Sequence, residues 1–212
     1  MARLTQKERI RGFGISRLEA FSDGVFAIAI TILVLEIGVP KGAEEDLLKA
    51  LLGQWPAYLA YFVSFATIGA AWFAHSAITE HLERSDRGLA RINLLILMFV
   101  SFLPFPSKLL AEFIGNPSQE RVAATLYGTV LFLITILLSF LWKYAQKNKL
   151  VKAESGQEDI DVISARFTPS LYGYAVIIIV GLFIPGIAVF GYLAIAVFIL
   201  FPTETLRKIL HK

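Results

Sequence analysis

The sequence predicts an all-α membrane protein with six transmembrane helices, and three observations support that fold class. The 212 residues are 56% hydrophobic and only 17% charged, and their mean hydropathy is +0.65. A soluble domain of this length could not bury so much apolar surface. The apolar residues also gather in long uncharged blocks. We therefore expect residues 1–212 to form one membrane-embedded domain with no separate soluble domain.

Four of the blocks have about the length of one crossing, which needs about 20 mostly apolar residues. They predict spans over residues 20–39, 55–79, 91–111 and 122–143. The last block, Phe167 to Thr203, is uncharged throughout and too long for one span. Pro185-Gly186 in its middle predicts a tight turn, because proline breaks a helix and glycine tolerates positive φ. We therefore expect two further spans, over residues 166–184 and 187–203.

The basic residues predict the orientation, because short loops rich in lysine and arginine stay in the cytoplasm. If the N-terminus is cytoplasmic, the outer side holds only Lys41, Lys49, Lys108 and Arg121, so 16 of the 20 Lys and Arg residues lie inside. We therefore expect both termini in the cytoplasm. This topology also accounts for the net charge of +3, so the charge gives no reason to expect a nucleic-acid partner.

The first predicted span carries one narrow apolar stripe. At about 100° per residue, Ile28, Ile32 and Leu35 share one face of the helix, and Thr31 lies at the margin of that face. Stripes of this kind pack against lipid or other helices more often than they line a pore. Periodicity alone therefore leaves the role of the stripe open.

The same span contains an ionisable residue, Asp23, next to Ser22. A charge in a membrane helix costs several kcal/mol unless it is paired or hydrated. Both side chains point about 120–140° away from Ile28, toward neighbouring helices that offer polar partners. We therefore expect a structural polar lock, whose candidate residues are Arg17, Phe21, Ser22, Asp23, His75 and Asn93.

Soluble-enzyme motifs are absent from the sequence. It has no phosphate-binding glycine-rich loop, no Gly-x-Ser-x-Gly and no His-Glu-x-x-His. Because it has no cysteine, thiolate ligands and thiol nucleophiles are excluded. The three histidines lack ligand spacing. We therefore expect neither an enzyme nor a metal site nor a cofactor.

Several motifs resemble the transmembrane protein 175 family in its single-repeat prokaryotic form. Arg17 together with Phe21-Ser22-Asp23-Gly24-Val25-Phe26-Ala27-Ile28-Ala29-Ile30-Thr31 is similar to the first-span signature of that family. Further similar stretches are Trp72-Phe73-x-His75, Arg91-Ile92-Asn93 and Phe102-Leu103-Pro104-Phe105-Pro106. Together these motifs cover roughly the first half of the chain.

The resemblance implies a homotetrameric potassium channel in a prokaryotic plasma membrane, with the first helix of each subunit lining a central pore. It implies K⁺ as the permeant ion, rings of Ile28, Ile32 and Leu35 as the constriction, and Thr31 as a secondary selectivity candidate. A bare cation in such an aliphatic ring would cost tens of kcal/mol, so a dry ring is a closed gate. We expect a modest preference for K⁺ over Na⁺, because K⁺ sheds its water more readily.

Two other function classes stay open. A proton-coupled secondary transporter or a proton leak channel would use Asp23 and His75 as its titrating pair. A non-transporting scaffold or an intramembrane enzyme is the third class, although no acid-base or nucleophile set is evident at membrane depth. Unitary currents from the purified protein in a planar bilayer would support only the channel.

Overall fold

The computed structural model describes residues 14–40 and 42–201, apart from the side chains of residues 157–159 and 166. Its regular elements are α2 Ile15–Leu35, α3 Leu47–Gly53, α4 Trp55–Glu80, α5 Arg87–Phe102, α6 Pro104–Phe113, α7 Pro117–Lys147, α8 Gln157–Phe183 and α9 Pro185–Leu200. An isolated antiparallel bridge between Leu82 and Val151 ties the loop after α4 to the loop after α7. The described part of the chain is thus a helical bundle.

Five stretches of the described chain are long and apolar enough to cross a membrane: Ile15–Leu35, Trp55–Glu80, Arg87–Phe113, Pro117–Lys147 and Ile160–Phe183. The prediction of an all-α membrane protein is therefore confirmed. α9 is also apolar but has only 16 residues, fewer than the about 20 that one crossing needs. The count of six spans stays a prediction, and residues 202–203 of the sixth expected span lie outside the described residues.

Pro104 does not end the third span. It removes one backbone donor, but Leu103 keeps helical dihedral angles and the helix resumes as α6 up to Phe113. The Ser107 backbone N–H and its hydroxyl both donate to the Leu103 carbonyl oxygen, at 3.1 and 2.8 Å. The proline therefore divides one membrane-spanning stretch into two helical segments.

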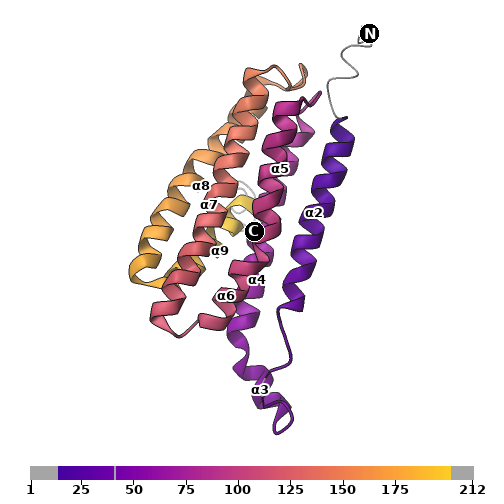
Figure 1. The fold of residues 1–212 in the computed structure, drawn as a ribbon. Helices are drawn as coiled ribbons and strands as arrows, with labels where there is room; N and C mark the ends of the chain where they lie inside the picture. The colour runs from indigo at the N-terminus through magenta and orange to yellow at the C-terminus, as the bar shows by residue number, and fades with distance from the viewer. Residues whose placement is uncertain (1–13, 41, 202–212) are drawn as a thin grey trace, which may run out of the picture.

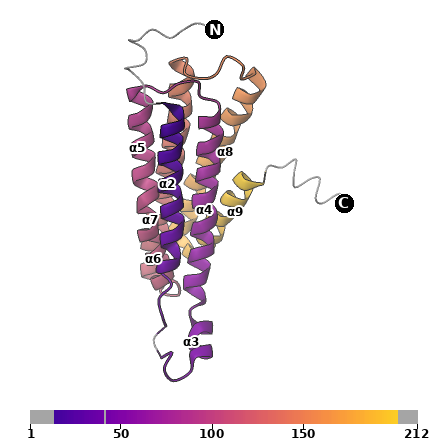
Figure 2. The ribbon, with the colours of Figure 1, turned by 90° about the vertical axis from the view of Figure 1, so that its right-hand side faces the viewer.

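The helices form an elongated bundle in which α2 lies at one edge (Figure 1). α4 is central, because it packs against α2, α6, α7 and α9. α8 and α9 form a hairpin on the side of the bundle remote from α2 (Figure 1). The short α3 projects beyond one end of the bundle, in line with α4 (Figure 2). The position of α2 at the edge decides which of its side chains the rest of the chain can cover.

Candidate functional site

α2 has one face that packs on the bundle and one that does not. Its buried side chains are Leu18, Ser22, Phe26, Ala29 and Leu33, at spacings of three or four residues. This spacing places them on one side of a helix, where α2 contacts α4 and α5. Figure 2 looks onto the opposite side, and none of the described helices lies in front of it.

The predicted apolar stripe lies on the uncovered side of α2. Ile28 is 60% exposed, Ile32 38% and Leu35 77%, and Thr31 is exposed beside them. The Thr31 hydroxyl donates to the Ile28 carbonyl oxygen at 3.0 Å, so its proton is used within its own helix. The stripe is thus free to meet lipid or another copy of the chain.

Three buried polar side chains form a hydrogen-bonded chain from α4 through α5 to α2. His75 Nε2 lies 2.7 Å from Asn93 Oδ1, and Asn93 Nδ2 donates to Ser22 Oγ at 2.9 Å. Ser22 Oγ donates in turn to the Leu18 carbonyl oxygen at 2.8 Å. Because an amide oxygen only accepts, this arrangement places the His75 proton on Nε2. The chain of donors therefore runs in one direction, from α4 into α2.

Asp23 accepts a hydrogen bond from a side chain that was not among the candidates for the polar lock. Its side chain is exposed, and its Oδ1 accepts a hydrogen bond from Trp72 Nε1 at 2.8 Å. Trp72 lies three residues before His75, so the two side chains share one side of α4. That spacing is the signal that could have identified Trp72 as the partner. Asp23 thus lies on the flank of α2 that faces α4, outside the buried chain.

Arg17 and Phe21, the remaining candidates for the polar lock, lie apart from the buried chain of Ser22, Asn93 and His75. Both side chains are exposed, and Phe21 is 56% exposed. They precede Ile28 by 11 and 7 residues, so the helical repeat returns each to within about 20° of Ile28. Ser22 lies about 100–140° away from both. The helical repeat therefore places both on the side of the apolar stripe, and their part in the polar lock stays a prediction.

A second buried polar cluster was not expected from the sequence. Ser64 Oγ donates to Ser107 Oγ at 2.7 Å, and Thr67 Oγ1 lies 2.6 Å from the Tyr127 hydroxyl. These contacts join α4 to α6 and α7. Ser64 and Thr67 are three residues apart and so share one side of α4, which is the signal available in the sequence. Hydroxyl pairs of this kind hold membrane helices together.

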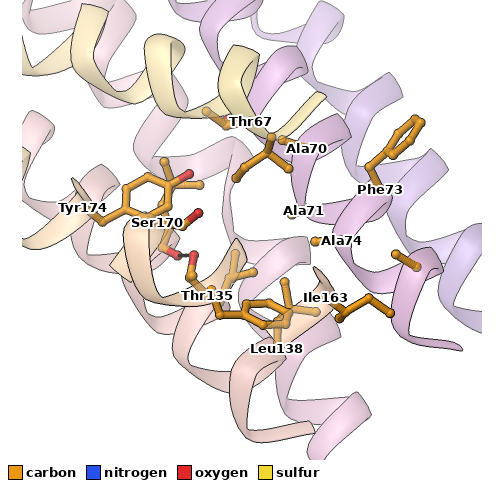
Figure 3. Close-up of a pocket in the computed structure, with 15 residues that line it drawn as sticks. Thr67, Ala70, Ala71, Phe73, Ala74, Thr135, Leu138, Ile163, Ser170 and Tyr174 are labelled. Carbon is orange, nitrogen blue, oxygen red and sulfur yellow. Dashed lines mark hydrogen bonds between the residues drawn. The ribbon is translucent and has the colours of Figure 1, made fainter. Parts of the chain in front are cut away.

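A cavity lies between α4, α7, α8 and α9, and no residue of α2 lines it. Figure 3 shows Ala70, Ala71 and Ala74 of α4 on one side of it and Ser170 and Tyr174 of α8 on the other. The small alanine side chains leave this space between the helices. Because none of the predicted site residues lines the cavity, it is separate from the uncovered face of α2.

The described part of the chain gathers no cluster of three or more histidines or carboxylates that could hold a metal ion. Two of its acidic side chains are engaged elsewhere. Glu36 Oε2 pairs with Lys108 Nζ at 2.9 Å, and Glu120 Oε2 accepts from the Gly115 backbone N–H at 3.1 Å. The chemistry of this site is therefore that of an apolar surface backed by neutral hydrogen bonds.

Known proteins match the chain over this site. The family model described as endosomal/lysosomal potassium channel TMEM175 matches residues 17–104. A potassium channel from Chamaesiphon minutus is 44% identical over 162 residues, which cover 74% of this chain and 79% of that protein. The Homo sapiens endosomal/lysosomal proton channel TMEM175 is 38% identical over 138 residues, which cover 61% of this chain and 27% of that protein.

A solved structure is similar as well. The crystal structure of a lysosomal potassium-selective channel TMEM175 homolog from Chamaesiphon minutus superimposes with a TM-score of 0.79. The alignment has 37% sequence identity and covers 87% of this chain and 95% of that chain. The similarity therefore extends over most of the chain, beyond the residues that the family model matches.

Proposed function

The chain belongs to the TMEM175 family, and on this premise we propose that it forms a potassium-permeable cation channel. Its relatives are ion channels and not enzymes, which agrees with the lack of catalytic motifs in the sequence. The proposed assembly is a homotetramer in which one α2 from each subunit lines a central pore. Residues 1–212 would act as a single six-span domain that needs no cofactor.

The observation that carries this proposal is the uncovered face of α2. Ile28, Ile32 and Leu35 line that face, while Ser22 on the opposite side is tied to Asn93 and through it to His75. The buried polar chain fixes the rotation of α2 about its own axis. A fixed rotation matters if the stripe has a defined target, which in a tetramer is the pore axis.

The proposed constriction consists of three aliphatic rings. At 1.5 Å per residue, the Ile28 and Ile32 rings lie about 6 Å apart along the axis, and the Leu35 ring follows after about 4.5 Å. Aliphatic rings that are too narrow for water block ions by dewetting. Conduction therefore requires the rings to widen enough to admit hydrated or partly hydrated K⁺.

Selectivity in this pore would be modest. Potassium channels with a carbonyl filter replace the hydration shell of the ion with backbone oxygens, and the Thr-Val-Gly-Tyr-Gly string of such filters is absent here. The Thr31 hydroxyl is committed to a backbone carbonyl as a donor, so it offers the pore only its oxygen lone pairs. We expect a preference for K⁺ over Na⁺ that follows from the easier dehydration of K⁺.

The five apolar helices of spanning length make this a membrane protein. We infer further that it resides in a prokaryotic plasma membrane with both termini in the cytoplasm. Support for this orientation comes from the distribution of lysine and arginine, 16 of which lie on one side in the expected topology.

The proposal is tested by recording from the purified protein in planar lipid bilayers. Unitary currents that reverse toward the K⁺ equilibrium potential in a mixed K⁺ and Na⁺ gradient are the expected result. Equal permeability of K⁺ and Na⁺ would contradict the selectivity, and a complete lack of unitary currents would overturn the channel. Chemical crosslinking or native mass measurement in detergent tests the tetramer.

A proton pathway is the second candidate function. His75 is 1% exposed, and its Nδ1 has no hydrogen-bond partner within the described part of the chain. Asp23 is exposed on the same turn of α2 as Ser22, and the human relative is named a proton channel. Because this chain spans only 27% of that protein, we keep proton transport as the alternative. Acidification of proteoliposomes under a pH gradient measures it directly.

A further inference from the structure

Arg17 lies on the face of α2 that carries the proposed constriction. It precedes Ile28 by 11 residues, so it returns to within about 20° of the Ile28 direction, about 16 Å further toward the N-terminal end of the helix. Its side chain is exposed. Phe21, which is 56% exposed, lies between the two on the same face. A basic residue therefore continues the apolar stripe at its N-terminal end.

No acidic side chain of α2 shares this face. Glu19 points about 180° away from Ile28, and Asp23 points about 140° away and accepts the hydrogen bond of Trp72. Glu36 follows the C-terminal end of the helix, where it pairs with Lys108. The charge of Arg17 is thus not compensated by any acidic residue on the stripe of α2.

We propose that Arg17 lowers the conductance of the channel for K⁺ that enters from the N-terminal side. The Arg17 guanidinium groups of the four subunits form a positive ring at that mouth of the pore. The inference rests on the proposed channel function and its fourfold assembly. Four such charges around one axis repel every cation that approaches from this side. They leave cations that arrive from the opposite side unaffected until these have passed the aliphatic rings.

The size of the effect follows from simple electrostatics. Four unit charges about 8 Å from the axis, which is one Debye length at physiological ionic strength, lower the local cation concentration about threefold to fourfold in a solvent with the dielectric constant of water. At 1 M salt the Debye length falls to about 3 Å, and the depletion almost disappears. At low salt, the unitary current should therefore be smaller for K⁺ that enters from the N-terminal side than for K⁺ that enters from the opposite side.

The test compares Arg17→Gln with the unaltered channel in excised patches, at about 0.15 M and about 1 M KCl. For K⁺ entering from the side of the N-terminus, the substitution should raise the unitary current about twofold to fourfold at the lower concentration. At the higher KCl concentration, the substitution should change the unitary current little. Arg17→Lys should behave like the unaltered channel. The control Arg91→Gln removes an exposed charge of α5, off the stripe, and should leave the current unchanged.

Two results would overturn the inference. The first is an unchanged current in Arg17→Gln at low salt while Ile28→Asn alters conduction, which leaves the channel intact and removes only the role of Arg17. The second result matters if Arg17→Gln does not assemble. In that case the inference fails if the unaltered channel rectifies to the same extent at both salt concentrations. If Ile28→Asn has no effect either, the pore assignment itself fails.

Discussion

His75 and Asn93 meet at a distance of 2.7 Å, Nε2 to Oδ1, where α4, α5 and α2 come together. Both side chains are buried, with 1% and 2% exposure. The Asn93 amide oxygen accepts a hydrogen bond from His75 of α4, and its amide nitrogen donates one to Ser22 of α2. One side chain thus links three helices by hydrogen bonds.

Replacing this amide should loosen the attachment of α2. In Asn93→Leu, His75 Nε2 loses its acceptor and Ser22 Oγ loses its donor in a buried site, which costs about 1–3 kcal/mol per unsatisfied group. We expect a lower melting temperature and less assembled protein in detergent. The control Ser101→Ala removes an exposed hydroxyl of the same α5, which only bonds to the Met98 carbonyl. Equal melting temperatures for the two variants would show that the amide does not hold α2.

Asp23→Asn separates the channel from the proton pathway. The asparagine keeps an oxygen that can accept from Trp72 Nε1 but cannot take up or release a proton. If the protein is a potassium channel, the variant should assemble and conduct K⁺ with little change. If protons move through Asp23, the variant should lose its proton flux. Unitary K⁺ current and dye-reported acidification of proteoliposomes give the two readouts. Trp72→Phe serves as the control, because it removes the hydrogen bond and keeps the carboxylate.

A polar ring at the constriction should ease its wetting. Ile28→Asn places an amide on the side chain that is 60% exposed on the stripe, and hydrated polar rings do not exclude water as aliphatic ones do. We expect a larger unitary conductance or a weaker preference for K⁺ over Na⁺. Val34→Asn is the matched control, because Val34 is 51% exposed on the same helix but points about 120° away from Ile28. If Val34→Asn alters conduction and Ile28→Asn does not, a different face of α2 lines the pore.

Gly128 marks a close contact between α7 and the α8–α9 hairpin. A Cβ added there would meet the Tyr192 hydroxyl and would lie 2.9 Å from Ile178 Cγ1. Gly128→Ala should therefore destabilise the protein by about 1–3 kcal/mol, as overpacking does, and thermal melting in detergent measures the loss. In Gly69→Ala the new Cβ has no heavy atom within 4 Å, so this control should be neutral or slightly stabilising, because alanine favours a helix. Similar losses in both variants would contradict the close contact.

The sequence predicted the bundle better than it predicted the ends of its helices. Hydropathy records which residues lie at membrane depth, but a helix continues wherever its backbone hydrogen bonds continue. α2 accordingly begins at Ile15, five residues before the expected span, and α7 ends at Lys147 instead of residue 143. Pro104, which lies inside the expected third span of residues 91–111, is the point at which the structure divides that span into α5 and α6.

At the candidate site, the helical wheel placed Ser22 on the side of the neighbouring helices, and the structure joins it there to Asn93. The wheel also placed Ile28 on the opposite side, which no described helix covers. A wheel drawn for the first span does not show which side chain of α4 meets Asp23, so Trp72 stood in the sequence only as part of a family motif, although its spacing from His75 places both on one side of α4. Arg17 and Phe21 were grouped with the lock because they lie close to Asp23 in the sequence, although the wheel places them on the side of the stripe.

The uncovered face of α2 has a consequence for how copies of the chain associate. Lipid chains are as apolar as Ile28 and Leu35, so covering the stripe with protein gains little hydrophobic free energy inside a bilayer. Association through this face depends on close packing and polar contacts, and it competes with solvation by lipid. The conducting fraction should therefore fall as the protein is diluted into more lipid, which makes the lipid-to-protein ratio a control on activity.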